Sequence, residues 1–295
     1  MNNQPQFYQQ TRIPSTFDRW KKNFLANRLA SSALVVLLIV VFIALFAPWL
    51  APYDPAAQFD DFTVPPAWYE NGTSRYLLGT DDLGRDLFSR LVHGARLSLK
   101  LALTVVVIAA ATGMLIGSIT ALSSRWIEQP LLRLMDLILA LPSLLLAIVI
   151  VSVLGPGLPN AIYAVAIVLI PHFVLVTRNA IKNELGKEYI TAIKLDGVSK
   201  FRLFTHAIFP NILPTLIVQL TLAFSTAILE IAALGFLGLG AQAPNPEWGT
   251  ILSESHVYIT IAPWTVALPG LAIFFTLLSI NLVGDGLRDA MDLDN

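Results

Sequence analysis

The side chains that most often do chemistry are few in this sequence, and they are not arranged as a catalytic site. Cysteine is absent, which excludes thiolate catalysis, disulfides and cysteine-bound metals. The only Gly-Lys pair, Gly186-Lys187, is followed by glutamate instead of Ser or Thr, so the chain has no Walker-type phosphate loop. The four histidines lack a metal-binding spacing: His93, His172, His206 and His256. We therefore expect no enzyme activity, no ATP hydrolysis, no metal and no cofactor.

Three ionisable residues lie in apolar stretches, where an ion-coupled transporter would need them. Lys100 is close enough to the end of its stretch for the amine to reach the interface. Asp136 is one helical turn from Arg133, with which it can pair. Glu230 lies roughly 27 Å along its helix at 1.5 Å per residue, near the far interface. We predict that none relays protons and that a partner supplies the energy for transport.

The composition is that of a membrane protein. The chain has 295 residues, of which 55% are hydrophobic and 13% charged, with a net charge of −1 and a mean hydropathy of +0.67. Soluble domains carry about 25% charged residues, so a soluble enzyme fits poorly, and the net charge gives no case for a nucleic-acid partner. Because lipid offers no partners to open strand edges, we predict an all-α integral membrane protein with six transmembrane helices. The expected spans are 29–48, 97–122, 131–154, 160–177, 212–237 and 262–283.

The distribution of Lys and Arg predicts the topology. The N-terminal tail 1–28, the loops after the second and fourth spans and the C-terminal tail together hold 14 of the 19 basic residues, whereas the loop 49–96 holds four. Basic loops stay in the cytoplasm, so both termini are expected there and 49–96 outside. The first span follows 28 mostly polar residues and lacks a good cleavage site, so we expect an anchor and not a signal peptide.

Local patterns within and beside the spans predict how the helices pack. Residues 86–99 place apolar residues on one helical face with arginines beside it, which indicates an interfacial amphipathic helix leading into the second span. Gly113 and Gly117 form a small-xxx-small pair that predicts close helix packing. Kinks are expected at three prolines inside spans: Pro142, Pro171 and Pro269.

Residues 178–210, between the fourth and fifth spans, have the pattern of a helix–turn–helix. Helical spacing places four apolar residues on one face: Ile181, Leu185, Tyr189 and Ala192. Gly197 suits the left-handed backbone that ends a helix. A second short helix carries further apolar residues and closes at a proline: Phe201, Phe204, Ile208 and Pro210. We predict a helical plug for a groove on a partner; the alternative is an ordinary surface loop.

This loop resembles the EAA motif of bacterial ABC-importer permeases, Glu-Ala-Ala-x3-Gly-x9-Ile-x-Leu-Pro. Thr191-Ala192-Ile193, Gly197 and Pro210 occupy the motif positions, and the Gly-to-Pro interval matches. Four residues differ in type from the motif: Thr191, Ile193, Ala207 and Phe209. Because Thr191 replaces the glutamate of the motif, a contact specific to that side chain is not expected at residue 191. The turn is still expected, because its glycine, Gly197, is retained.

Three further segments resemble the peptide/nickel family of these permeases, and most of all the C-type subunits of dipeptide permeases. The first is Leu-Gly-Thr-Asp-Asp-Leu-Gly-Arg-Asp-Leu-Phe-Ser-Arg within 78–99. The second is Leu-Gly-Phe-Leu-Gly-Leu-Gly-Ala-Gln-Ala-Pro within 232–249, and the third is Val-Gly-Asp-Gly-Leu-Arg-Asp-Ala-Met-Asp within 281–292. The similarity covers about residues 20–295.

The resemblance implies a type I ABC-importer permease of MetI-like fold, with residues 97–295 as its five-helix core. It implies import of short peptides, dipeptides above all, across the bacterial inner membrane; relatives carry nickel, glutathione, antimicrobial peptides or haem-related compounds. It also implies a second, B-type permease subunit, two ATPase subunits that hydrolyse the ATP, and a periplasmic substrate-binding protein. Contact with the ATPases is expected at Tyr189, Thr191, Ala192, Asp196, Gly197, Phe201, Phe204 and Pro210.

Polar residues inside the spans are candidates for the solute pathway, because a peptide needs hydrogen-bond partners along its route. The candidates are Ser143, Gln219, Thr221 and Ser225, with Asn160 and Thr226 besides. The same side chains can instead join helices to one another, and both interpretations stay open. The rival classes for the whole chain are a stand-alone channel and an ion-coupled transporter.

Overall fold

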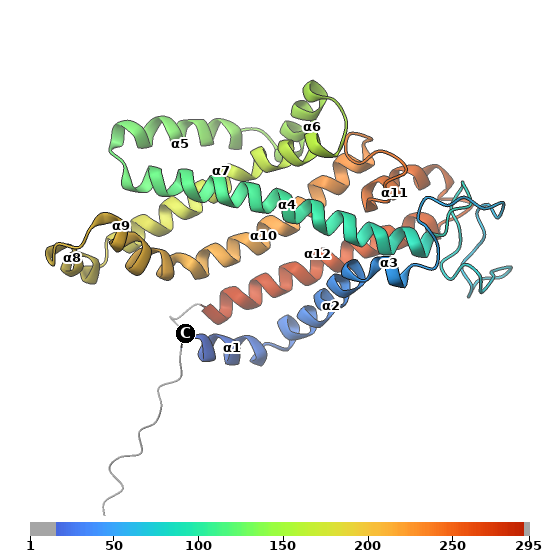
Figure 1. Ribbon diagram of the computed structural model, residues 1–295, viewed down its shortest axis with the longest axis horizontal. Coiled ribbons are helices and arrows are strands. Elements are labelled where there is room, and N and C mark those ends of the chain that lie inside the picture. The colour runs from blue at the N-terminus through green and yellow to red at the C-terminus, as the bar shows by residue number, and fades with distance from the viewer. Residues whose placement is uncertain (1–15, 292–295) are drawn as a thin grey trace, which may run out of the picture.

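The computed structural model describes residues 16–291, and within this range the chain is helical, with no strand longer than an isolated bridge between Thr80 and Asp86. Five long helices run side by side along the longest axis (Figure 1): α2 (Arg28–Leu45), α4 (Leu87–Leu122), α7 (Leu158–Leu185), α10 (Phe209–Phe236) and α12 (Trp264–Met291). The shorter helices are α1 (Thr16–Ala26), α3 (Ala47–Leu50), α5 (Arg125–Leu139), α6 (Ser143–Leu154), α8 (Glu188–Leu195), α9 (Lys200–Leu203) and α11 (Trp248–Ser255). A π-helical turn, Phe204–Ile208, joins α9 to α10, and a 3-10 turn, His256–Tyr258, follows α11.

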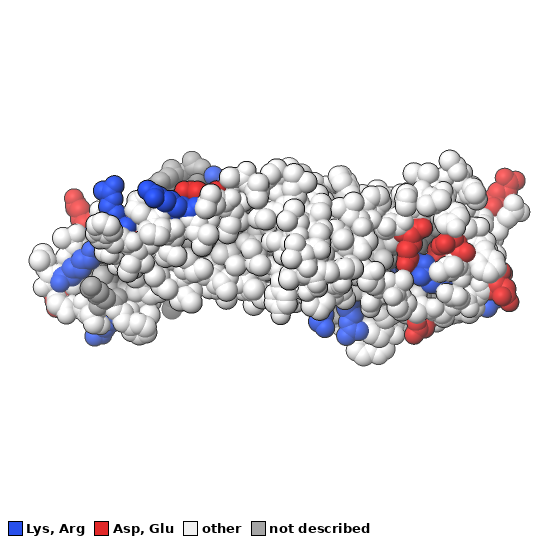
Figure 2. All heavy atoms as spheres, turned by 90° about the horizontal axis from the view of Figure 1, so that it is seen from above, with Lys and Arg blue, Asp and Glu red and all other residues white. Residues whose placement is uncertain are grey.

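The bundle has two distinct ends. The α8 end holds α8, α9, the start of α1 and the finish of α12, and the α11 end holds the loop 51–86 and α11 (Figure 1). On the face shown in Figure 2, Lys and Arg outnumber acidic residues at the α8 end, and Asp and Glu gather at the α11 end. The long stretch between the ends carries few charges on that face. A charge-poor belt between two charged ends is the arrangement of a membrane-spanning bundle.

Five helices are long and apolar enough to cross a membrane, and a sixth span exists if the bent pair α5 and α6 is one crossing. Residues 131–154, predicted as the third span with a kink at Pro142, correspond to this pair, in which α5 and α6 meet at an angle of 92°. Pro142 favours a break at this place, because proline disfavours helical backbone in the residue before it and has no amide hydrogen for the ladder. Pro171 and Pro269, in contrast, lie inside the unbroken helices α7 and α12.

Two glycines bring α4 and α7 into close contact, as the sequence predicted. A Cβ on Gly113 would lie 2.5 Å from the Cβ of Phe173, and a Cβ on Gly117 would lie 2.7 Å from the carbonyl oxygen of Val174. Neither distance leaves room for a larger residue. Because glycine has no side chain, the backbones of α4 and α7 can approach each other closely at these two positions, as in other membrane helix pairs.

Candidate functional site

The helix α8 continues from α7 through a sharp break, not as one amphipathic helix. The chain leaves α7 at Gly186, and Lys187 is extended, with φ −77° and ψ 144°. This break rotates the following residues, so Ile190 is fully buried while Tyr189 and Ala192 are exposed. The predicted continuous apolar face that joined Ile181 to Ala192 is therefore wrong, because the helical period restarts after residue 187.

A small apolar cluster holds α8 on the bundle. Its buried members come from α4, α7, α8, α9 and α10 and the π-turn: Ala121, Ile181, Ile190, Leu203, Ile208, Ile212 and Leu216. Ile193 and Phe204 pack against it while half-buried. Of the predicted coupling residues, Phe204 thus faces the interior of the α8 end. The cluster therefore packs α8 against three membrane-length helices, α4, α7 and α10.

A polar network reinforces the same joint. The Tyr189 hydroxyl donates to Glu184 at the end of α7, and Asn211 Nδ2 in α10 donates to the Tyr189 oxygen at 2.8 Å. Lys187 Nζ pairs with Glu184 at 2.7 Å. Burial raises the pKa of Tyr189, and the hydrogen bond to the Glu184 carboxylate raises it further. Sequence reasoning missed Glu184 and Asn211, since no local pattern links residues on α7 and α10.

Gly197 forms the turn between α8 and α9 in the conformation that the sequence predicted. Its φ is +76°, in the left-handed region, and its amide donates to the carbonyl of Lys194 at 3.2 Å. Apart from its two chain neighbours, no described residue has an atom within 4 Å of the position that a Cβ would take. The glycine is therefore required by the backbone and not by crowding.

The second helix of the loop does not end at Pro210. The chain runs from α9 through the π-helical turn into α10, where Pro210 occupies the first turn. Proline is tolerated there because the first-turn amides of a helix need no partner within it. The π-turn, closed by the Phe209 amide on the Phe204 carbonyl, absorbs the change of register. The predicted closure at Pro210 is wrong for this reason.

Exposed residues of α8, α9 and the turn form the tip of this end. Thr191, Ala192 and Asp196 are exposed, and the two large apolar residues among them, Leu195 and Phe201, are 85% and 78% exposed. We call these five residues the coupling surface, after the ATPase contact that the family resemblance implies for this loop. Large apolar side chains in water at a protruding tip indicate a docking site for another protein. Leu195 was not among the predicted contacts, because its exposure follows from the break at residue 187, which the sequence did not indicate.

The predicted pathway residues have different surroundings. Gln219 lines a hollow of about 430 Å³ between α7, α10 and α12. Thr221 donates to the carbonyl of Val218 at 2.8 Å and packs where a Cβ on Gly284 of α12 would be. Ser225 is buried inside the bundle. Thr221 thus joins helices, whereas Gln219 is accessible to a solute.

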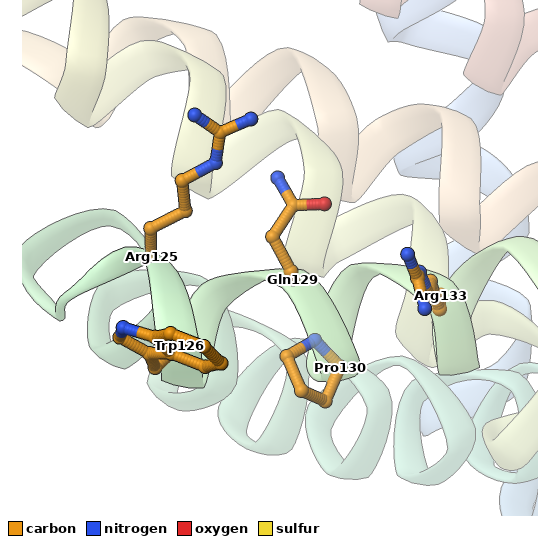
Figure 3. A pocket seen from close by; sticks show the side chains of 5 residues that line it. All are labelled: Arg125, Trp126, Gln129, Pro130 and Arg133. Atoms are coloured by element: carbon orange, nitrogen blue, oxygen red, sulfur yellow. The ribbon is translucent and has the colours of Figure 1, made fainter.

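Ser143, the fourth predicted pathway residue, begins α6 immediately after the bend. It lines a separate hollow of about 300 Å³ together with His172 of α7. A third hollow, of about 400 Å³, lies on α5 beside Trp126 and Pro130, and Arg125 and Gln129 extend to one side of that helix (Figure 3). The three hollows are separate places on the bundle surface.

A buried ionic network orders the α11 end. Asp81 accepts from Arg85 at 2.7 Å and from Arg90 at 2.5 Å, and both guanidinium groups also pair with Glu254 of α11, at 2.8 and 2.6 Å. Arg90 is fully buried. The helix predicted over 86–99 exists as the first turns of α4, but its interpretation as interfacial is wrong for this arginine. The guanidinium binds carboxylates from distant segments and does not face lipid headgroups.

A second buried carboxylate fixes α11 on α4. Glu247 caps α11 by accepting from the Thr250 amide at 3.0 Å, and it accepts from the Ser98 hydroxyl of α4 at 2.9 Å. Burial raises the pKa of Glu247. Trp248 Nε1 donates to the Leu91 carbonyl at 3.1 Å. The α11 end is therefore a rigid surface built on α4, while the α8 end presents a protruding helical tip.

Comparison with known proteins agrees with this architecture. The family described as the inner membrane component of binding-protein-dependent transport systems matches residues 113–294, and the N-terminal transmembrane domain of oligopeptide transport permease C matches residues 15–66. The chain is 52% identical over 293 residues to the di/tripeptide transport system permease protein DppC of Pseudomonas aeruginosa (strain UCBPP-PA14), covering 99% of this chain and 97% of that one. It is 50% identical over 270 residues to the dipeptide transport system permease protein DppC of Escherichia coli (strain K12), covering 91% and 90%.

A solved structure shares the fold. A chain of the MetNI methionine ABC transporter in an inward-facing conformation superposes with a TM-score of 0.57 at 18% identity, over 68% of this chain and 96% of that one. Bundle and tip together define a multi-pass transport subunit of the inner membrane. The chain belongs to the family of inner-membrane components of binding-protein-dependent transport systems, the permeases of ABC importers. This family works with ATPase and substrate-binding partners.

Proposed function

We propose that this chain forms half of the translocation pathway of an ATP-driven importer for di- and tripeptides. The observation that carries the proposal is sequence identity of 52% and 50%, over nearly the full length, to two permeases named for di/tripeptide and dipeptide transport. The other half comes from a second, homologous B-type permease subunit. A periplasmic protein delivers the peptide, and two separate ATPase subunits hydrolyse the ATP, so the chain needs no cofactor of its own.

We propose that the α8 end faces the cytoplasm. The described helices place the first and last segments at this end, and its Lys and Arg side chains are those expected on the cytoplasmic side. Both termini are then cytoplasmic, and the loop 51–86 with α11 faces the delivery protein. The coupling surface lies where an ATPase in the cytoplasm can reach it.

In this proposal the ATPase moves the transmembrane helices through α8. Closure of the ATPase dimer displaces the coupling surface, and the anchor formed by Ile190 and Tyr189 passes the displacement to α7 and α10. Packed helices move as rigid bodies, so the bundle rocks against its partner and opens alternately to each side. The rigid α11 end keeps its shape while the delivery protein releases peptide.

The test is ATP-dependent uptake by the reconstituted complex. The chain, a B-type sister permease, two ATPase subunits and a candidate binding protein from the same organism are placed in proteoliposomes, and radiolabelled dipeptides, tripeptides, nickel and glutathione are compared. We expect uptake of dipeptides and tripeptides only when ATP is present on the side of the membrane where the ATPase subunits lie. Uptake of nickel or glutathione but not of peptides would refute the proposal that the solute is a peptide. ATP hydrolysis by this purified chain alone would refute the proposal that separate subunits hydrolyse the ATP.

A further inference from the structure

We propose that the hollow between α7, α10 and α12 binds the C-terminal carboxylate of the peptide before release into the cytoplasm. This inference rests on the proposed function, since it supplies a solute site for a peptide importer. The hollow measures about 430 Å³, near the lower end of the range of roughly 300–1,000 Å³ for small-molecule sites. Its size suits a solute of two or three residues better than a long chain.

The lining combines an apolar wall with three polar side chains from two helices. Thr215 and Gln219 lie one turn apart on α10, and Arg288 lies near the end of α12. The apolar lining residues complete the wall: Val176, Pro214, Val218, Leu222 and Met291. A few polar groups placed in an apolar wall are what orients a bound small molecule.

The polar groups are available for a ligand. Thr215, Gln219 and Arg288 make no side-chain hydrogen bond or ion pair within residues 16–291. A guanidinium with an amide and a hydroxyl beside it offers several donors and one positive charge, which matches a carboxylate and the peptide group next to it. Neighbouring Asp285 and Asp289 are exposed and are not paired with Arg288.

The position of the hollow fits a last binding site on the inward route. Gln219 lies in the third turn of α10 and Arg288 in the last turn of α12, so the site belongs to the end proposed to be cytoplasmic. Arg288 is exposed, which weakens its attraction for a carboxylate by screening. A weak, accessible site holds a peptide briefly and lets it leave.

Arg288 also has a simpler explanation, as a cation that stabilises the carbonyl end of α12. That role predicts no difference between a peptide acid and the same peptide with a C-terminal amide. The carboxylate site predicts that the acid binds better, and that this preference requires Arg288.

The experiment uses photolabelling of the intact permease–ATPase complex in nanodiscs, without the binding protein. A dipeptide with a diazirine side chain is irradiated on the complex, and labelled residues are mapped by mass spectrometry. Unlabelled dipeptide acid and its C-terminal amide then compete for the label. We expect label on Val218 or Leu222, and an acid that competes about 3- to 10-fold better than the amide.

Variants separate the carboxylate site from the structural role. Arg288→Gln should abolish the preference for the acid, and Arg288→Lys should retain part of it. Arg133→Gln is the matched control, because Arg133 is an exposed arginine that lines a different hollow (Figure 3). Each variant is checked for normal abundance and assembly.

Two results would overturn the inference: no label in the hollow, or a preference for the acid that persists in Arg288→Gln. Uptake by the same complex is measured in parallel. If the complex imports dipeptides but fails these tests, only the proposal of the carboxylate site is refuted. If the complex imports no peptide at all, the proposed function itself is refuted.

Discussion

Gly197→Val tests the coupling surface because it strains the backbone of the turn between α8 and α9 and leaves the residues of that surface unchanged. The turn has a φ of +76°, and among the described residues beyond its chain neighbours no atom lies within 4 Å of the new Cβ, so backbone strain is the main expected effect. An L-residue in the left-handed region costs about 1–2 kcal/mol, and a β-branched residue lies at the upper end. That cost shifts the balance between the formed and the opened turn by roughly 5- to 30-fold.

We expect the affinity for the ATPase subunits to fall by up to that factor, because only the formed turn presents α8 and α9 together. The assay titrates labelled ATPase onto the permease pair in nanodiscs and measures peptide uptake at equal abundance. Gly186→Ala is the matched control: it lies in the same segment with a φ of −78°, and its Cβ would have ordinary contacts, the nearest at 3.5 Å. Gly197→Asn should have a smaller effect, since asparagine tolerates the left-handed region.

The reasoning is refuted if Gly197→Val binds the ATPase within about twofold of the wild type and transports normally. It is also refuted if Gly186→Ala is equally harmful, because the defect would then reflect general sensitivity of the segment. Reduced insertion in the membrane would contradict the expectation that the spans are unaffected.

Three further predictions concern stability. Both carboxylate oxygens of Glu230 are buried without a hydrogen bond of normal geometry within residues 16–291, although the Ser143 side chain lies close to them. Glu230→Met should therefore leave the melting temperature of the purified complex unchanged or raise it; a clear drop would show that the contact with Ser143 or another partner is required. Gly117→Val should overlap Val174 and cost about 1–3 kcal/mol or more, measured as loss of folded protein in a detergent melt, and a wild-type melt would contradict the close α4–α7 contact. Asp81→Ala leaves two buried guanidinium groups short of a partner and should cost about 3–5 kcal/mol, whereas Asp60→Ala, at an exposed carboxylate that forms no ion pair within residues 16–291, should cost under about 1 kcal/mol; equal effects in chemical unfolding would refute the contrast.

The features that the sequence predicted well are set by residues near one another in the chain. Apolar length marked five of the spans, and the glycine spacing at 113 and 117 marked a helix contact. Gly197 could be assigned because a left-handed turn is a property of the single residue.

The features that the sequence did not predict depend on distant partners. Arg90 could be taken for an interfacial arginine because its partner Glu254 lies 164 residues away. Tyr189 gave no sign that its hydroxyl would bind Glu184 and Asn211, on two different helices. The 92° break before Pro142 also exceeds what a proline alone specifies, since most prolines within helices only kink them.

The π-turn before α10 has a structural consequence. Because it joins α9 to α10 without interruption, residues Phe201–Phe236 form one 36-residue helix, about 54 Å long at 1.5 Å per residue. This segment extends from Phe201 at the tip of the α8 end to Phe236 at the α11 end. There Gly235 lies directly against Glu247, which caps α11. One continuous segment of the chain therefore carries an exposed residue of the tip at its start and contacts the cap of α11 near its end, so the two ends of the bundle share a structural element.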